Sequence, residues 1–124
     1  GAGLVGRLVQ VTGSRSIVQL VTDPDFDFGV RLARSGEIGI IHGRGAEQPL
    51  VVDAGIDLPV DVREREAVTT AGTERSIFPP DIPVGRVERL DVAPDQLSQV
   101  LDVRPLADLD DLAYVRVLQW TPPT

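Results

Sequence analysis

The chain has 124 residues, of which 42% are hydrophobic and only 4% aromatic, and its formal net charge is −7. This length suits one compact domain or two very small ones. The negative charge excludes the basic surface that nucleic-acid binding requires. The chain contains no Cys, which excludes disulfides and thiolate metal sites, and no apolar run approaches the roughly 18 residues of a membrane span. With so few aromatic residues, the core must consist of Val, Leu and Ile, and the β-branched residues among these favour pleated sheets.

The hydrophobic pattern predicts an all-β chain of short strands separated by turns that contain Gly, Pro and Asp. The clearest strand is 28–33, in which Phe28, Val30 and Leu32 alternate with small or polar residues. Residues 97–104 show helical spacing, whereas 98–103 also fit a strand. In chain order, the expected strands are 4–11, 16–22, 28–33, 37–42, 50–54, 67–70, 84–91 and 113–118.

A short internal repeat links the two ends of the chain. Val5-Gly6-Arg7 recurs as Val84-Gly85-Arg86, and each copy precedes a turn and a second apolar segment. The repeat predicts a duplicated hairpin, which favours a strand over a helix at 98–103. Gly inside a strand marks a bulge or a close approach of two backbones. We therefore expect structural roles for four residues, with each Arg paired across the sheet to a carboxylate: Gly6, Arg7, Gly85 and Arg86.

No catalytic constellation is visible in the sequence. His42 is the single histidine, and no Ser stands in the Gly-x-Ser-x-Gly pattern of a nucleophile elbow. We expect His42 to be a strand-end residue with one ring nitrogen satisfied. No catalytic, cofactor-binding or metal-binding residue is predicted.

Three short segments resemble functional loops but fit ordinary turns better. The run 23–27 (Asp-Pro-Asp-Phe-Asp) resembles the start of a calcium loop, but Phe28 and Arg34 occupy the positions where an EF-hand needs Gly and Glu. We expect an Asx-type turn there. Gly43-Arg44-Gly45 lacks the Gly-Lys-Ser/Thr of a phosphate loop and is expected to be a flexible hairpin tip. The stretch 63–66 (Arg-Glu-Arg-Glu) is expected to be a solvated edge.

The fragments along the chain occur in one characteristic order. This ordered set resembles the extracytoplasmic core of the rod shape-determining protein MreC family, over nearly the whole chain. The fragments are Gly3-Leu4-Val5-Gly6-Arg7, 16–24, Val30-Arg31-Leu32, Ser35-Gly36-Glu37, 39–45, Val68-Thr69-Thr70-Ala71-Gly72, Phe78-Pro79, 82–87 and 105–110.

The resemblance implies an all-β fold of two small barrel-like units that are similar to chymotrypsin-type barrels without the catalytic triad. We assign 33–81 to one unit, 1–32 and 82–120 to the other, and 121–124 to a tail. The resemblance also implies a scaffold that is not an enzyme and needs no cofactor. The partners it implies are a class B penicillin-binding protein, MreD, MreB indirectly, and further copies of the chain. It implies an extracytoplasmic location, with the full-length protein anchored in the membrane by a segment absent here.

The sequence departs from the family pattern at several Gly positions. Asp81 stands where the family has Gly before Ile-Pro-Val-Gly, and Arg65-Glu66 replaces a Gly-Asp pair. Thr73-Glu74-Arg75-Ser76 replaces a Gly-rich run. Because Gly supplies positive φ, we expect these loops to run differently. The first hairpin of the family core is also expected to be missing upstream of Gly3, which would leave an exposed edge strand.

Candidate partner contacts are Phe26 and Phe28 in the acidic loop and Phe78 beside two prolines, although Phe28 fits better as a filler of its own barrel. Two rival functions remain open. One is a serine hydrolase on a chymotrypsin-like barrel. The other is a cell-wall-fragment binder that uses Tyr114 and Trp120 as aromatic platforms.

Overall fold

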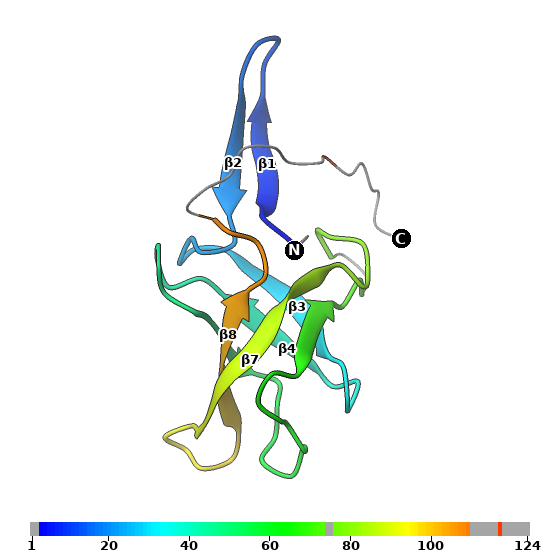
Figure 1. The fold of residues 1–124 in the computed structure, drawn as a ribbon, viewed down its shortest axis with the longest axis vertical. Coiled ribbons are helices and arrows are strands. Elements are labelled where there is room, and N and C mark those ends of the chain that lie inside the picture. Colours follow the sequence, from blue (N-terminus) through cyan, green and yellow to red (C-terminus); the bar gives the residue numbers. More distant parts are fainter. Residues whose placement is uncertain (1–2, 74–75, 110–116, 118–124) are drawn as a thin grey trace.

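The computed structural model describes residues 3–73, 76–109 and 117, and each regular element in these ranges is a β-strand (Figure 1). The all-β class is confirmed. The predicted closing strand at 113–118, and residues Tyr114 and Trp120, lie outside the described residues except for Val117. The strands are β1 (Gly6–Val11), β2 (Ser16–Leu20), β3 (Asp27–Leu32), β4 (Ile38–His42), β5 (Leu50–Ala54), β6 (Ala67–Thr70), β7 (Pro83–Val92) and β8 (Gln99–Pro105).

Six of these strands close into an antiparallel barrel, in the order β3-β4-β5-β8-β7-β6, with β6 pairing back to β3. The other two, β1 and β2, form a separate hairpin that projects from one end of the barrel (Figure 1). The strand reading of 98–103 is confirmed, because β8 forms ladders with both β5 and β7. No helix among the described residues has the length and hydrophobicity that crossing a membrane requires.

The barrel draws its strands from both of the predicted units, so their residue ranges differ from the observed arrangement. Strands β4, β5 and β6 fall within 33–81, whereas β3, β7 and β8 fall within the ranges assigned to the other unit. The physical reason is that closure depends on long-range pairs, β3 with β6 and β5 with β8, which local patterns do not reveal. That the β1–β2 hairpin belongs to a second small barrel stays a prediction.

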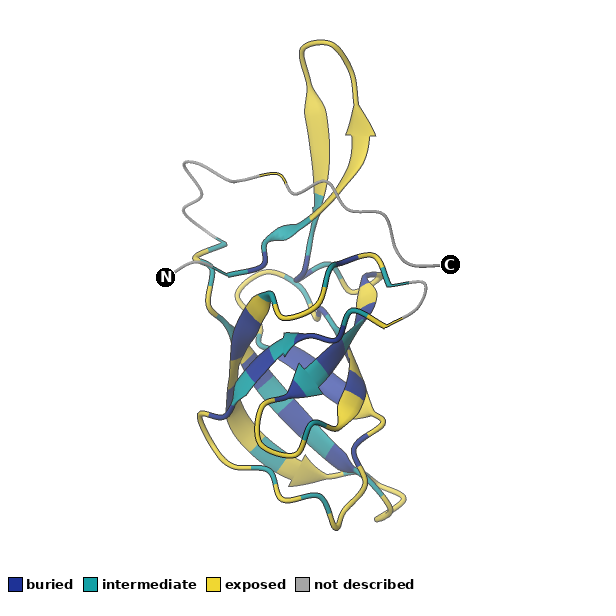
Figure 2. Cartoon of the chain, turned by 90° about the vertical axis from the view of Figure 1, so that its right-hand side faces the viewer, coloured by how far each residue is buried: buried dark blue, intermediate teal, exposed yellow. Residues whose placement is uncertain are grey.

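Aliphatic side chains fill the barrel, as the composition predicts. Val30, Leu32, Ile41, Leu50, Leu101 and Val103 are at most 1% exposed. Buried and exposed residues alternate around the barrel wall, whereas the projecting part of the hairpin is exposed on both strands (Figure 2). The core therefore lies within the barrel. The projecting part of the β1–β2 hairpin is not part of this core.

The base of the hairpin is tied into the barrel. The N–H of Leu4 donates to the carbonyl of Pro83 at 2.8 Å, and the N–H of Val21 donates to the carbonyl of Val5 at 2.9 Å. Leu4 and Val21 belong to the barrel's hydrophobic core. The hairpin is thus anchored at its base, even though its far end is free of contacts with the barrel.

Two loops keep a left-handed backbone without Gly. Arg65 and Asp81, which replace Gly of the family pattern, have φ of 68° and 67°. The left-handed conformation is thus retained at both positions, at the cost of the strain that an L side chain carries there.

Candidate functional site

Phe26, Phe28 and Phe78 lie together in the core rather than on the surface. They are 1%, 5% and 7% exposed, and their ring centroids are 5.5 Å apart for Phe26–Phe28, 5.8 Å for Phe26–Phe78 and 5.2 Å for Phe28–Phe78. Rings buried to this extent cannot reach a partner while the barrel is closed. The burial of Phe28 agrees with a filler of its own barrel, whereas Phe26 and Phe78 lack the exposed position that a contact residue needs.

The signal that places Phe26 inside is present in the sequence. Phe26 continues the two-residue period of Phe28, Val30 and Leu32, all of which are buried. The N–H of Phe26 donates to the carbonyl of Asp23 at 3.0 Å, which turns the chain so that the ring faces inward. Because Asp25 and Asp27 flank Phe26, the sequence around it is typical of an exposed acidic loop, and the continuation of the strand pattern is not obvious.

Arg7 covers the cluster from the hairpin side. Its guanidinium carbon lies 5.1 Å from the Phe26 ring centroid, and its Nε donates to the Gln19 side-chain oxygen at 3.1 Å. Gln19 in turn donates to Asp23 Oδ2 at 3.1 Å. The backbone N–H of Asp25 and then the amide of Gln19 lower the pKa of Asp23. This chain of contacts joins the hairpin to the first barrel strand.

The repeated glycines occupy equivalent places in two hairpins. A Cβ on Gly6 would lie 2.0 Å from the carbonyl oxygen of Gln19, and a Cβ on Gly85 would lie 2.1 Å from that of Arg104. In each hairpin the register then shifts at the third residue after the glycine, Val9 in β1 and Glu88 in β7. Both glycines thus allow a close approach of the two backbones in their hairpins, and the repeat corresponds to two hairpins of the same construction.

The arginines of the repeat form no ion pair with a carboxylate of any described residue, contrary to expectation. Arg7 bonds an amide oxygen and covers a ring, as described above, and Arg86 Nη1 donates to the backbone carbonyl of Arg65 at 2.9 Å. The carbonyl partner holds the strained Arg65 turn against β7. Both arginines therefore act structurally, through different acceptors.

His42 has oxygen atoms at both ring nitrogens. Nε2 lies 2.9 Å from Asp53 Oδ2, and Nδ1 lies 3.0 Å from the carbonyl of Gly43. The Asp53 carboxylate is the main reason that the pKa of His42 is raised above its ordinary value, and burial acts in the opposite direction. A catalytic His needs one nitrogen facing a nucleophile. Among the described residues no hydroxyl group is hydrogen-bonded to His42.

The two glycine- and aspartate-rich loops are structural. Asp23 Oδ1 accepts the N–H of Asp25 at 2.9 Å, so the expected Asx turn is confirmed. A Cβ on Gly43 would lie 2.2 Å from the carbonyl carbon of Thr22, and the N–H of Gly45 donates to the Thr22 carbonyl at 2.8 Å. The described residues contain no group of three or more His, Cys, Asp or Glu side chains placed to hold a metal ion.

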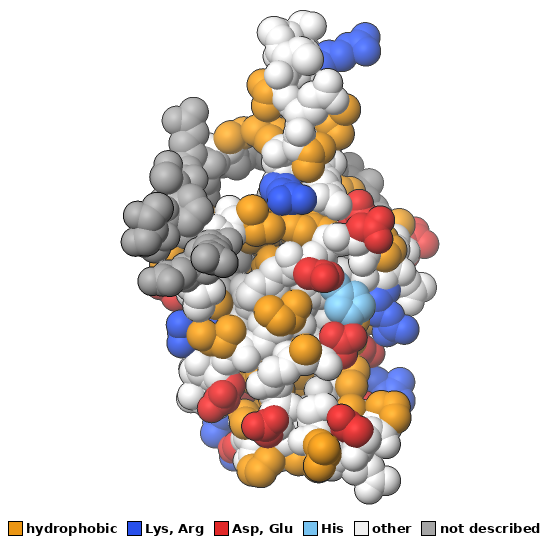
Figure 3. Space-filling model, turned by 180° about the vertical axis from the view of Figure 1, so that it is seen from behind, with side chains coloured by type: hydrophobic (Ala, Val, Ile, Leu, Met, Phe, Trp, Pro, Cys, Tyr) orange, Lys and Arg blue, Asp and Glu red, His pale blue; other side chains and the backbone are white. Residues whose placement is uncertain are grey.

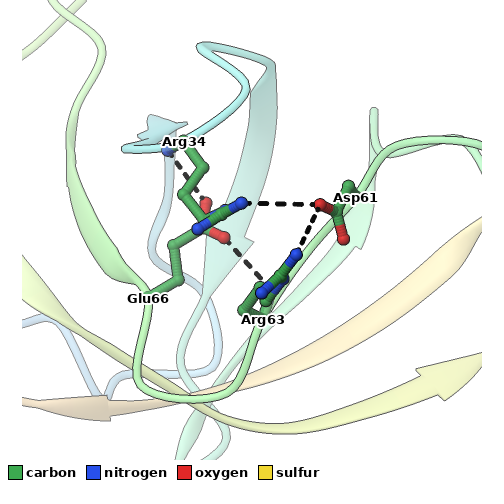
Figure 4. A network of polar contacts seen from close by, with 4 residues as sticks. All are labelled: Arg34, Asp61, Arg63 and Glu66. Carbon is green, nitrogen blue, oxygen red and sulfur yellow. Dashed lines mark hydrogen bonds and ion pairs between the residues drawn. The ribbon is translucent and has the colours of Figure 1, made fainter.

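The charged stretch 63–66 is only partly solvated, which corrects the expectation of an open edge. Glu66 is 6% exposed, and its carboxylate accepts the N–H groups of Arg34 at 3.2 Å and Arg63 at 3.1 Å. Asp61 lies between the two guanidinium groups, 3.6 Å from Arg34 and 3.5 Å from Arg63 (Figure 4). Glu66 thus joins the loop after β3 to the loop before β6 by accepting hydrogen bonds from backbone N–H groups of both.

A cleft lies where the hairpin meets the barrel. It has a volume of about 340 Å³ and is lined by Leu20, Thr22, residues 46–49, Glu88, residues 104–105 and residues 107–109. Its size is at the lower end of small-molecule sites, and none of the described residues that line it is aromatic.

The fold and the site define an all-β barrel module with a structural, tightly hydrogen-bonded hairpin junction. The family model described as "Rod shape-determining protein MreC, barrel core" matches residues 1–119. The chain therefore belongs to the MreC family, whose characterised members determine cell shape.

Individual relatives agree with this assignment. The cell shape-determining protein MreC of Cereibacter sphaeroides is 34% identical over 119 residues, which cover 96% of this chain and 37% of that protein. The crystal structure of MreC from Pseudomonas aeruginosa has a TM-score of 0.79 at 26% identity and covers 88% of this chain and 69% of that one. The chain thus spans well under half the length of this curated relative.

A third similar structure is the complex between penicillin-binding protein PBP2 and MreC from Helicobacter pylori. It has a TM-score of 0.64 at 21% identity and covers 81% of this chain and 60% of that one. At this identity the likeness shows the fold alone.

Proposed function

We propose that the chain is a non-enzymatic extracytoplasmic scaffold of the cell-wall elongation complex, which organises peptidoglycan synthases through protein–protein contacts. The observation that carries this proposal is the match of nearly the whole chain to the MreC barrel core. Among the described residues, the interior of the barrel is filled with aliphatic and Phe side chains.

The partner we propose is a class B penicillin-binding protein, supported by the PBP2–MreC complex of Helicobacter pylori. MreD, MreB indirectly, and further copies of this chain complete the proposed set. The same family membership supports an extracytoplasmic location, which we include in the proposal.

The rival hydrolase has one observation in its favour, the His42–Asp53 pair. The other ring nitrogen of His42, Nδ1, lies against the backbone carbonyl of Gly43. A general base needs that nitrogen next to the hydroxyl group of a nucleophile. Labelling of any Ser by a fluorophosphonate probe would overturn the scaffold proposal. The rival sugar binder depends on Tyr114 and Trp120, outside the described residues, and Trp120 fluorescence during titration with peptidoglycan fragments tests it.

The direct test is biolayer interferometry of this chain against the extracytoplasmic part of the cognate class B penicillin-binding protein at physiological salt. Saturable binding that substitutions on one surface patch weaken supports the scaffold. Absence of binding, both for this chain and for a longer stretch of the protein that contains it, rejects the proposed partner.

A further inference from the structure

The end of the barrel opposite the hairpin carries an exposed apolar group. Here the loop from β5 to β6 meets the loop from β7 to β8 (Figure 1). Leu58, Val92 and Leu97 are 39%, 52% and 73% exposed. We call these three residues, with Asp57, Asp91 and Asp95 beside them in sequence, the barrel tip. Seen from behind, acidic side chains lie among hydrophobic ones at this end of the molecule (Figure 3).

The barrel tip is held in place by hydrogen bonds. The N–H of Leu97 donates to Asp95 Oδ1 at 2.9 Å, and the N–H of Leu58 donates to the carbonyl of Leu97 at 3.3 Å. The N–H of Ala93 closes the β7–β8 turn by donating to the carbonyl of Ser98 at 2.9 Å. These bonds fix both apolar loops relative to each other.

The buried side-chain amide of Gln99 also links strand β8 to the loop between β5 and β6. Gln99 is 8% exposed, and its Nε2 donates to the carbonyls of Asp57 at 2.9 Å and Val60 at 2.8 Å. Because Val92 and Gln99 are register partners, their side chains lie on the same face of the sheet, beside the loop that Gln99 holds. An apolar surface ordered in advance loses little conformational entropy when a partner binds.

The three charged residues of the barrel tip are acidic, although Arg44 and Arg89 line a hollow together with Asp91. Asp57, Asp91 and Asp95 form no ion pair with any described residue, and the oxygens of Asp91 and Asp95 accept only nearby backbone N–H groups. Carboxylates left free around an apolar surface match a partner whose apolar pocket is bordered by Arg or Lys, since complementary charges guide association and fix its orientation.

We infer that the barrel tip is the docking surface for a protein partner with an apolar pocket bordered by basic side chains, and that Leu97 inserts into this pocket. This inference rests on the proposed function, since it names the face through which the scaffold binds its synthase. A second copy of the chain is a poorer occupant, because a copy carries a net charge of −7.

The test measures binding of the extracytoplasmic part of the class B penicillin-binding protein to four variants of this chain. Leu97→Ser removes the exposed apolar side chain, and Asp57→Arg reverses the charge of an exposed side chain that forms no hydrogen bond or ion pair with any described residue. Val11→Ser, at a site 65% exposed on the hairpin, and Asp25→Arg, in the exposed acidic turn, are the matched controls. Circular dichroism melting confirms that all four variants fold.

Leu97→Ser is expected to weaken binding by about tenfold or more, as for a central contact residue. Asp57→Arg is expected to slow association and reduce its dependence on salt, while both controls bind as the parent does. Parent-like binding by both tip variants overturns the inference and leaves the proposed function intact. No binding by the parent overturns both. Loss of self-association alone in Leu97→Ser, seen by analytical ultracentrifugation, assigns the barrel tip to a second copy and also overturns the inference.

Discussion

Phe26→Ala tests whether the aromatic cluster is core or contact surface. The side chain is 1% exposed, meets two other rings at 5.5 and 5.8 Å, and supports the Arg7 guanidinium at 5.1 Å. Truncating a buried Phe to Ala costs about 3–5 kcal/mol, a large part of the roughly 5–15 kcal/mol that stabilises a domain. At about 4 °C for each kcal/mol, the melting temperature should fall by roughly 10–20 °C.

Differential scanning calorimetry of Phe26→Ala beside Val9→Ala gives the comparison, since Val9 is 50% exposed on the hairpin. Val9→Ala is expected to change the melting temperature by less than about 3 °C. A parent-like melting temperature for Phe26→Ala, together with lost binding of the penicillin-binding protein, would refute the placement of this ring in the core.

Four further predictions follow from single contacts. Gly85→Ala forces a Cβ against the Arg104 carbonyl and should lower the free energy of unfolding by about 1–3 kcal/mol, measured by urea denaturation; an unchanged midpoint would contradict the close approach. Arg65→Gly relieves a φ of 68° and should stabilise by about 0.5–1 kcal/mol, because strain relief of about 1–2 kcal/mol exceeds the added chain entropy; a loss of stability would show that the turn is unstrained. Glu66→Gln replaces one of the two accepting oxygens with an NH2 donor. The free energy of unfolding should fall by about 1–3 kcal/mol, measured by urea denaturation; an unchanged free energy of unfolding would place Glu66 in solvent. The His42 imidazole, the single one in the chain, should titrate by NMR above 6.5, and Asp53→Asn should lower its pKa; equal values in both proteins would exclude the ion pair.

The sign of the His42 effect on stability follows from its raised pKa. The folded state holds the proton more tightly than the unfolded state, so the stabilisation is complete below the unfolded value of 6.5 and is lost as the pH rises through the higher folded value. Unfolding free energies of the parent should therefore fall from pH 6 to pH 8 relative to those of Asp53→Asn. A parallel pH dependence in the two proteins would contradict this assignment.

Local patterns were sufficient for strands β1 to β7 and for the internal repeat. The two-residue period of Phe28, Val30 and Leu32 gave β3, and the repeated glycines marked two hairpins whose registers shift at the same offset. These features depend on residues close in sequence, where side-chain period and Gly sterics act directly. The ordered fragments also gave the family.

The unit boundaries and several site residues required the structure. Barrel closure joins β3 to β6 and β5 to β8, pairs that no local signal specifies. Glu66 was expected in solvent because its neighbours are charged, yet its acceptors meet N–H groups 32 and 3 residues away. The exposure of Leu97 is not predicted, because its segment fits both a helix and a strand. A large apolar residue within the turn sequence Ala-Pro-Asp-Gln-Leu-Ser does indicate an exposed apolar side chain.

The scaffold account is tested most directly by amide hydrogen exchange of this chain with and without a saturating concentration of the extracytoplasmic part of the class B penicillin-binding protein. The account predicts slower exchange at residues 57–60 and 92–98, where the barrel tip would be covered, with unchanged exchange in β3. Identical exchange along the whole chain in both samples would contradict the claim that this module binds the synthase.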